Sequence, residues 1–130
     1  MGFQNVKTYD PLFPETAVKP TITCDCIICF EVVEHTTDPK ATFDDLFSLL
    51  DERGIVLFST FTQPGNMEAL GANWCCIGPK NGHVSIYTRV SLKTVIRDAG
   101  FSFGSLNESW HLIFLNIPGF ADHLLSDLFP

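Results

Sequence analysis

The chain has 130 residues, 45% of them hydrophobic, and a formal net charge of −7. This length and composition suit one domain with a packed core, and the negative charge argues against nucleic acid as a partner, since duplex binding needs Lys and Arg to neutralise phosphates. No uncharged apolar run approaches the roughly 18 residues of a membrane span, and the N-terminus lacks a signal-peptide pattern, so we expect a cytoplasmic protein that binds no membrane.

The first quarter of the chain leads into a strongly apolar segment. Residues 3–10 alternate weakly and end in Asp-Pro, which predicts a short strand followed by a turn. Residues 11–23 contain three prolines and are expected to form a loop. Residues 24–32 have the sequence CDCIICFEV, which is typical of a strand buried on both faces of a parallel sheet.

A helix and a second strand are expected next. Asp38 and Pro39 match an N-cap followed by proline at the first helical position. Apolar residues then recur at three- and four-residue steps to about Asp51, and Gly54 is a natural helix stop. Residues 55–61 are branched and aromatic, which predicts a second buried strand.

The second half begins with a long connection, residues 62–88, of a length that often carries function. Ser91 then caps an amphipathic pattern that predicts another helix. The remaining predicted elements are, in order, this helix (91–100), an antiparallel pair of strands (101–109 and 110–117) and a short amphipathic helix (119–129).

This order of elements predicts an α/β fold in which residues 1–130 form one domain that ends in an antiparallel strand pair. Ligands in open α/β sheets bind at the carboxyl ends of the strands. Asp10 and the segment Glu31–His35 both follow predicted strands. We therefore expect the functional site to include them.

Three functional interpretations are open for Glu31, Glu34 and His35: a metal site, an acid/base cluster, or the rim of a cofactor pocket. This segment alone supplies few ligands for a divalent ion, so we predict no metal site. A structural role is the fourth interpretation, with Glu31 capping nearby backbone and Glu34 facing water.

The sequence resembles a known family over about residues 2–116. Residues 25–66 are similar to the central part of class I S-adenosylmethionine-dependent methyltransferases, in the branch that includes the ubiquinone-biosynthesis O-methyltransferases. Residues 82–101, GHVSIYTRVSLKTVIRDAGF, are also similar to this branch. The matching positions of the central pattern are Asp25, Cys29, Phe30, Glu31, Val32, Glu34, His35, Asp38, Pro39, Gly54, Ser59 and Thr60.

The resemblance implies a Rossmann-like sheet that uses S-adenosylmethionine to methylate an unknown acceptor. By this resemblance, Asp10 binds the ribose hydroxyls, and Cys29, Phe30 and Glu31 line the cofactor. His35 and His83 are then the candidate catalytic residues, because a neutral imidazole can take a proton from an acceptor hydroxyl.

The chain departs from the family pattern at its N-terminal side. It contains no Gly-x-Gly-x-Gly turn, and its first predicted strand corresponds to the second strand of the family sheet. We therefore expect a truncated domain whose first strand is missing. Such a sheet has two unpaired inner edges, so we expect either that residues 3–9 pair beside residues 25–31 or that a second copy covers the exposed edge as a homodimer. The alternative function is a degenerate, non-catalytic methyltransferase-like module that acts in protein interaction or self-association.

Overall fold

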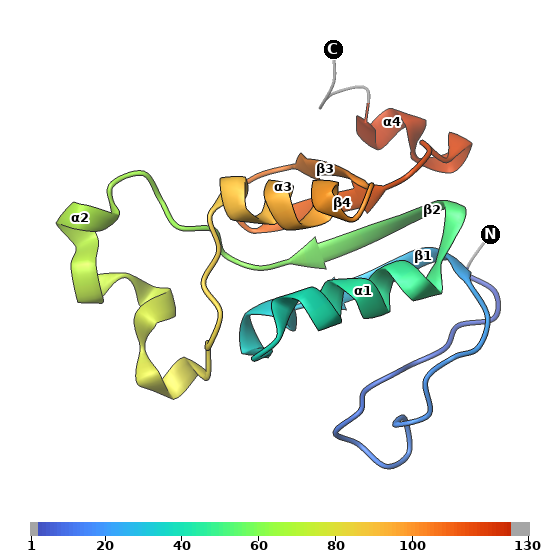
Figure 1. Ribbon diagram of the computed structural model, residues 1–130, viewed down its shortest axis with the longest axis horizontal. Helices are drawn as coiled ribbons and strands as arrows, with labels where there is room; N and C mark the ends of the chain where they lie inside the picture. Colours follow the sequence, from blue (N-terminus) through green and yellow to red (C-terminus); the bar gives the residue numbers. More distant parts are fainter. Residues whose placement is uncertain (1–2, 126–130) are drawn as a thin grey trace.

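The structure is a computed structural model and describes residues 3–125. Its strands form one sheet in the order β1–β2–β4–β3, shown in Figure 1. The strands are β1 (Cys24–Phe30), β2 (Leu50–Ser59), β3 (Ser102–Ser105) and β4 (Trp110–Phe114). β1 and β2 are parallel, while β4 is antiparallel to both β2 and β3. The prediction of an α/β fold ending in an antiparallel strand pair is confirmed.

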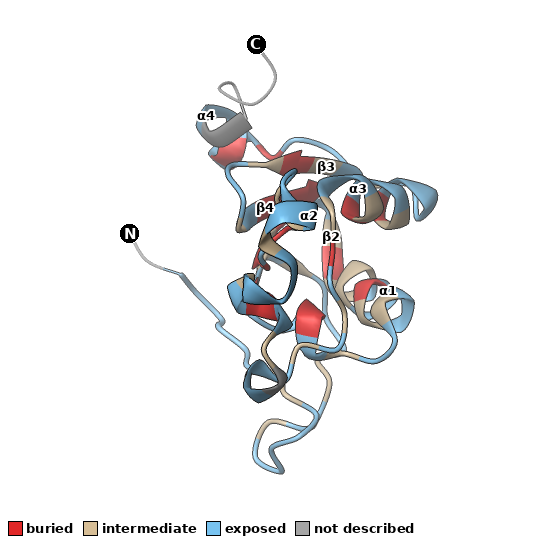
Figure 2. Ribbon diagram, turned by 90° about the vertical axis from the view of Figure 1, so that its left-hand side faces the viewer, coloured by how far each residue is buried: buried red, intermediate tan, exposed pale blue. Residues whose placement is uncertain are grey.

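Helices α1 (Pro39–Leu49) and α3 (Arg89–Asp98) lie on the same face of the sheet, as Figures 1 and 2 show. Two single-turn helices, α2 (Met67–Leu70) and α4 (Asp122–Leu125), complete the α-helices of the described chain. No helix within residues 3–125 is long and apolar enough to cross a membrane.

The main core lies between this helical layer and the sheet. Phe43 of α1 is fully buried, and its ring contacts the rings of Phe47, Phe58 and Tyr87. Leu92 and Ile96 of α3 and Val56 of β2 belong to the same cluster. A smaller apolar cluster covers part of the opposite face and consists of Ile55, Leu112, Phe114 and Ala121. The polar site described below lies beyond the carboxyl end of β1.

α1 begins where the sequence predicts but ends earlier. The carboxylate of Asp38 accepts a hydrogen bond from the backbone N–H of Ala41 at 3.0 Å, with Pro39 at the first helical position. The helix ends at Leu49 and β2 starts at Leu50, so the prediction that Gly54 stops the helix is wrong. The reason is close strand pairing: a Cβ at Gly54 would lie 2.9 Å from the carbonyl oxygen of Cys24 in β1.

The N-terminal segment corrects two predictions. Residues 3–10 form no strand, and among residues 3–125 β1 pairs with β2 alone. The expectation that residues 3–9 pair beside residues 25–31 is therefore wrong. β1 is also not buried on both faces, because Ile28 and Phe30 remain 56% and 41% exposed. Its even-numbered side chains face away from α1 and α3, where the described elements leave part of the sheet uncovered.

The second half has the predicted elements, but the bounds of its helices and strands differ: β3 and β4 are shorter than the predicted strands 101–109 and 110–117. α3 is capped by Thr88 rather than Ser91; Ser91 completes a capping box in which each side chain bonds the backbone N–H of the other residue. The long connection holds α2 and three short 3-10 helices (Gly71–Asn73, Cys75–Ile77 and Pro79–Asn81). Residues 126–129 of the predicted C-terminal helix lie outside the described residues.

Replacing Gly54 by alanine tests the close approach of β1 and β2. The added methyl group would meet Leu50 Cδ1 at 2.8 Å as well as the Cys24 oxygen, so we expect a loss of about 1–3 kcal/mol in the free energy of unfolding, as is typical of overpacking. Gly65→Ala is the matched control, because its Cβ would meet no atom within 4 Å. Chemical denaturation measures both variants, and equal stabilities would contradict this account of Gly54.

Candidate functional site

The site begins where β1 ends, at Glu31. This residue adopts a left-handed backbone conformation, with φ of 52°, which non-glycine residues rarely adopt. Ser59, the last residue of β2, stabilises it twice: its Oγ accepts a hydrogen bond from the Glu31 N–H at 3.0 Å and donates one to Glu31 Oε1 at 2.8 Å. The Glu31 carboxylate is thereby bound to the neighbouring strand.

The short 3-10 helix η1 (Val33–His35) follows and is bound by a distant segment of the chain. The carbonyl oxygen of Glu34 accepts hydrogen bonds from the N–H groups of Val84 and Ser85 at 2.9 and 3.0 Å. The buried Tyr87 hydroxyl donates to the Val33 carbonyl at 3.0 Å. These contacts join residues about 50 positions apart and bring His83 beside Glu34.

Glu34 is the most unusual residue of the site. Its side chain is buried, with a relative exposure of 3%, and among residues 3–125 no group donates a hydrogen bond to either carboxylate oxygen. Thr60 and Glu31 lie nearby without meeting hydrogen-bond geometry. Burial, reinforced by the nearby Glu31 charge, raises the pKa of Glu34 above its usual value. A buried carboxylate without a partner is costly for a fold, which points to a ligand.

His35 and His83 flank this carboxylate, with ring centroids 4.9 Å apart. His35 Nδ1 lies 3.0 Å from the carbonyl oxygen of Gly82, and His83 Nδ1 lies 3.1 Å from that of Cys76. A carbonyl oxygen can only accept, so Nδ1 carries the hydrogen in each ring and donates it. In a neutral ring the lone pair then sits on Nε2, where it can bind a metal or take a proton.

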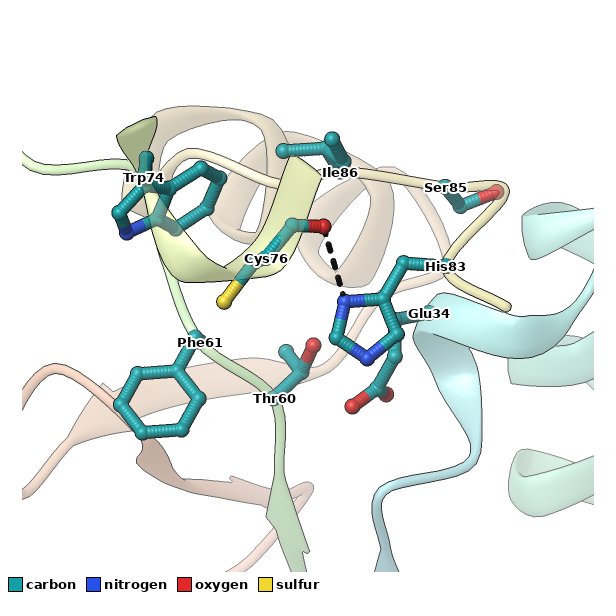
Figure 3. Close-up of a pocket in the computed structure, with 8 residues that line it drawn as sticks. All are labelled: Glu34, Thr60, Phe61, Trp74, Cys76, His83, Ser85 and Ile86. Atoms are coloured by element: carbon teal, nitrogen blue, oxygen red, sulfur yellow. Dashed lines mark hydrogen bonds between the residues drawn. The ribbon is translucent and has the colours of Figure 1, made fainter. Parts of the chain in front are cut away.

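Glu34 and His83 lie in a small pocket, drawn in Figure 3. The ring nitrogen of His83 that does not face Cys76 is directed toward the Glu34 carboxylate. The pocket volume is about 10 Å³, enough for about one water molecule or ion. The lining residues are Glu34, Thr60, Phe61, Trp74, Cys76, His83, Ser85 and Ile86.

Glu34, His35 and His83 together have the arrangement of a metal-ligand set. One ligand atom from each of Glu34, His35 and His83 lies within 4.8 Å of the other two. Two imidazoles and a carboxylate suit divalent transition metals, and a carbonyl bonded to the second nitrogen of each histidine is the usual support for such ligands. The set extends the short ligand list on which the prediction of no metal site rested, because that prediction considered residues 31–35 alone.

The predicted cofactor residues Cys29, Phe30 and Glu31 do not line this pocket. Cys29 is buried, and burial together with the Glu34 charge raises the pKa of its thiol to about 11. The Phe30 ring is exposed at the carboxyl end of β1 and packs edge-on against Trp110, with centroids 4.7 Å apart. The cofactor-binding roles of Cys29, Phe30 and Glu31 stay predictions. The small pocket itself is too small for a nucleoside.

Asp10 is not brought to Phe30 and Glu31. Its carboxylate accepts a hydrogen bond from the Leu12 N–H at 2.9 Å, and its backbone bonds to Thr16, which closes a local turn. Figure 1 shows the N-terminal segment, in dark blue, looping away from the sheet before it returns to the start of β1. The ribose-binding role of Asp10 stays a prediction that this arrangement does not support.

Sequence reasoning missed two polar residues that shape the site. The sequence places Ser59 in a motif but does not predict its contacts to Glu31. His111 is fully buried and joins Ser105 to the carbonyl oxygen of Thr60, at 2.8 and 3.0 Å. Burial lowers its pKa, which favours the neutral ring. A histidine inside the apolar run WHLIF was the available signal, because a buried imidazole needs polar partners.

The fold and the site together define an open-sheet α/β protein with a polar site beyond the carboxyl end of a parallel strand. The family described as "Methyltransferase domain" matches residues 2–105, so the chain belongs to the methyltransferase domain family. No curated protein matches the chain.

Two solved structures show the same fold. An O-methyltransferase family protein from Burkholderia thailandensis aligns with a TM-score of 0.56 and 18% identity, covering 76% of this chain and 32% of that one. Magnesium protoporphyrin IX methyltransferase from Synechocystis PCC 6803, solved with bound SAH, aligns with a TM-score of 0.50 and 16% identity, covering 73% of this chain and 45% of that one. The chain thus spans less than half the length of each. Its sheet is a methyltransferase-type, Rossmann-like sheet.

The raised pKa of Glu34 predicts a pH-dependent stability in the absence of metal. Above its usual pKa of 4.5, the unfolded chain releases the Glu34 proton while the folded chain still holds it. The free energy of unfolding therefore falls as pH rises through this interval, by at most about 1.4 kcal/mol per pH unit for one proton.

Glu34→Gln removes this contribution. With a chelator present, we expect the stability of the variant relative to wild type to increase as pH rises from 4.5. The exposed Glu68→Gln is the control, and its difference from wild type is expected to stay constant with pH. Urea denaturation between acidic and neutral pH measures both. Parallel curves for wild type and Glu34→Gln would contradict the buried, unpartnered carboxylate.

Proposed function

We propose that this protein acts in S-adenosylmethionine-dependent methyl transfer to a hydroxyl group of an acceptor, which binds beside Glu34, His35 and His83. The family match over residues 2–105 carries the reaction class. The polar cluster supports a hydroxyl acceptor, because two imidazole nitrogens and a carboxylate oxygen lie within 4.8 Å of one another and such groups can take up a hydroxyl proton. The non-catalytic alternative lacks an observation that favours it over this function.

S-adenosylmethionine supplies an electrophilic methyl group on a sulfonium centre. The chain's own contribution on the cofactor side is the exposed ring of Phe30 and the fixed backbone of Glu31 at the carboxyl end of β1. An aromatic face attracts a cationic group that lies over it. These two residues are therefore suited to bind and orient the donor, while the smaller pocket next to η1 stays on the acceptor side.

On the acceptor side, His83 is the better placed of the two candidate bases. Its Nδ1–H is held by the Cys76 carbonyl, so the ring keeps a defined orientation with the other nitrogen toward Glu34. That nitrogen can accept the acceptor's hydroxyl proton, and the Glu34 carboxylate stabilises the imidazolium that forms. Methyl transfer also depends on in-line positioning, which the fixed segment of residues 83–87 provides.

A divalent cation at the same three residues is the alternative to His83 as base, because the nitrogen of His83 that would take the proton then binds the cation instead. The observation in its favour is the buried Glu34 carboxylate with no hydrogen-bond donor among residues 3–125. A cation there would neutralise this charge and lower the pKa of a bound hydroxyl. Glu34, His35 and His83 would be its protein ligands.

Cofactor binding is tested by NMR titration of the chain with S-adenosylmethionine. We expect shifts of the amide signals of Phe30, Glu31 and Ser59, with an affinity weaker than micromolar because the sequence contains no Gly-x-Gly-x-Gly turn. Phe30→Ala is expected to weaken the response, and Val90→Ala on the exposed side of α3 to leave it unchanged. No shift at these residues with saturating ligand would contradict the proposed donor wall.

Cation binding is tested with Mn²⁺, which prefers oxygen and nitrogen ligands to the thiols of this chain. Electron paramagnetic resonance measures the free ion. We expect the wild type to bind Mn²⁺ and Glu34→Gln to bind about tenfold or more weakly, because a ligand charge is lost. Glu68→Gln should match the wild type. Equal binding by all three proteins would remove the cation from the proposal and leave His83 as the base.

A further inference from the structure

Two adjacent cysteines lie at the pocket and take no part in the proposed reaction. Cys75 is exposed, whereas Cys76 is buried and lines the pocket. Both are free thiols, and their Sγ atoms lie 3.5 Å apart, close enough for one thiol to donate a hydrogen bond to the other. Two thiols at this distance can be oxidised together, because the second sulfur can reach any group that becomes attached to the first.

The backbone of the same pair holds a histidine of the candidate site. The Nδ1–H of His83 donates to the carbonyl oxygen of Cys76 at 3.1 Å, drawn in Figure 3. The side-chain amide of Asn81 donates to the carbonyl oxygen of Cys75 at 2.6 Å. The orientation of the His83 ring therefore depends on where the cysteine pair places its carbonyl groups.

We propose that Cys75 and Cys76 form a reversible redox site, in which a low-molecular-weight disulfide oxidises the pair to a disulfide and thereby releases His83 from the Cys76 carbonyl. The Cys75 thiolate attacks one sulfur of the small disulfide, whose S–S bond breaks as the first small thiol leaves. Cys76 Sγ then attacks Cys75 Sγ, and the second small thiolate leaves with the Cys76 proton. Two cysteine thiols lose two electrons, and one small disulfide becomes two small thiols.

The surroundings of the two thiols give the order of attack. Cys75 is open to solvent, so a small disulfide can reach its sulfur. Burial of Cys76, its hydrogen bond with Cys75 and the nearby charges raise the pKa of the Cys76 thiol to about 12, so this thiol is a poor first nucleophile. In the second step Cys76 is already held beside its target, and this proximity offsets its small fraction of thiolate.

A disulfide between adjacent residues is easily reduced again. The Cα atoms of disulfide-linked cysteines usually lie about 4.4–6.8 Å apart, whereas adjacent Cα atoms across a trans peptide lie only about 3.8 Å apart. Such a bond is strained, and strained or exposed disulfides are the labile, regulatory ones. The pair is therefore suited to reversible oxidation and not to a permanent crosslink.

Oxidation changes the backbone to which His83 is bound. The ring that the disulfide closes contains the peptide bond between the two cysteines, so it restricts the torsion angles on both sides of that bond. In the reduced chain these torsion angles belong to the short 3-10 helix Cys75–Ile77. A change in them redirects the carbonyl oxygens that bind Asn81 and His83. The redox site stands without the proposed function, and only the effect of its oxidation on methyl transfer rests on that function.

Oxidation of the 130-residue chain by glutathione disulfide is measured by mass spectrometry after the remaining thiols are alkylated. Trypsin cleaves after Arg53 and Lys80, and residues 54–80 contain Cys75 and Cys76 but no other cysteine. We expect this peptide to lose two hydrogen atoms and to regain them with a thiol reductant. An unoxidised peptide, or a glutathione adduct that persists on Cys75 of the wild type, would overturn the proposal.

Two serine variants test the order of attack. Cys76→Ser lacks the second thiol, so it should retain one glutathione on Cys75. Cys75→Ser should leave residues 54–80 without glutathione, because Cys76 is buried. Circular dichroism shows that each variant is folded. A glutathione adduct that forms on Cys76 of folded Cys75→Ser as fast as the wild-type pair oxidises would reject the assigned order.

NMR of the histidine rings tests the release of His83. Oxidation of the wild type should shift the ring signals of His83, while those of His123, which does not line the pocket, should stay in place. Cys75→Ser under the same treatment should show no shift at His83. Unchanged His83 signals in a chain that mass spectrometry shows to be oxidised would overturn the link to the site. Neither measurement uses S-adenosylmethionine or an acceptor, so failure of the proposed function would leave both results unaffected.

Discussion

The attachment of residues 84–87 to η1 is the contact on which the site depends. Two N–H groups, from Val84 and Ser85, converge on the carbonyl oxygen of Glu34, and the Tyr87 hydroxyl binds the preceding carbonyl of Val33. Apart from the Tyr87 hydroxyl, all these groups belong to the backbone. The contact therefore depends on the side chain of Tyr87 and on no other side chain of this segment. Without it, the long connection would have no fixed path across the carboxyl end of β1, and His83 would not meet Glu34.

Tyr87 has a second role that links this attachment to the core. Its ring packs against Phe43 of α1, and its backbone forms a parallel bridge with Thr62 just beyond β2. The same residue therefore joins the helical layer, the end of the sheet and η1. On the other side, His111 binds the Thr60 carbonyl and so fixes the strand end that forms the floor of the pocket. Two buried hydrogen bonds, Tyr87 to Val33 and His111 to Thr60, thus position the polar site without taking part in the proposed reaction.

The sequence predicts the elements of this fold well because their signals are local. The Asp38 cap, the apolar runs of the strands and the capped pattern of α3 each specify structure within about ten residues. The prediction for Gly54 is wrong because a glycine after a helical pattern can mark either the end of a helix or a close contact between strands, and the sequence does not distinguish the two. The failed strand at residues 3–10 had weak alternation and no partner strand, which sequence periodicity cannot reveal.

The candidate site was predictable in its parts but not in its assembly. Glu31, Glu34 and His35 are adjacent in sequence, so their position after a strand could be inferred. The distance between Glu34 and His83 depends on hydrogen bonds across about 50 residues, and no local pattern encodes them. The opposite holds for Asp10: its place after a predicted strand suggested a ligand-binding carboxylate, whereas the carboxylate closes its own turn.

Glu31 connects the strand edge to the site. Its left-handed conformation, held by Ser59, turns the chain out of β1 and into η1, so the position of Glu34 follows from the position of the last residues of β1. Those residues are bound on one side by β2. The position of Glu34 therefore depends on the pairing of β1 with β2, which also carries Ser59.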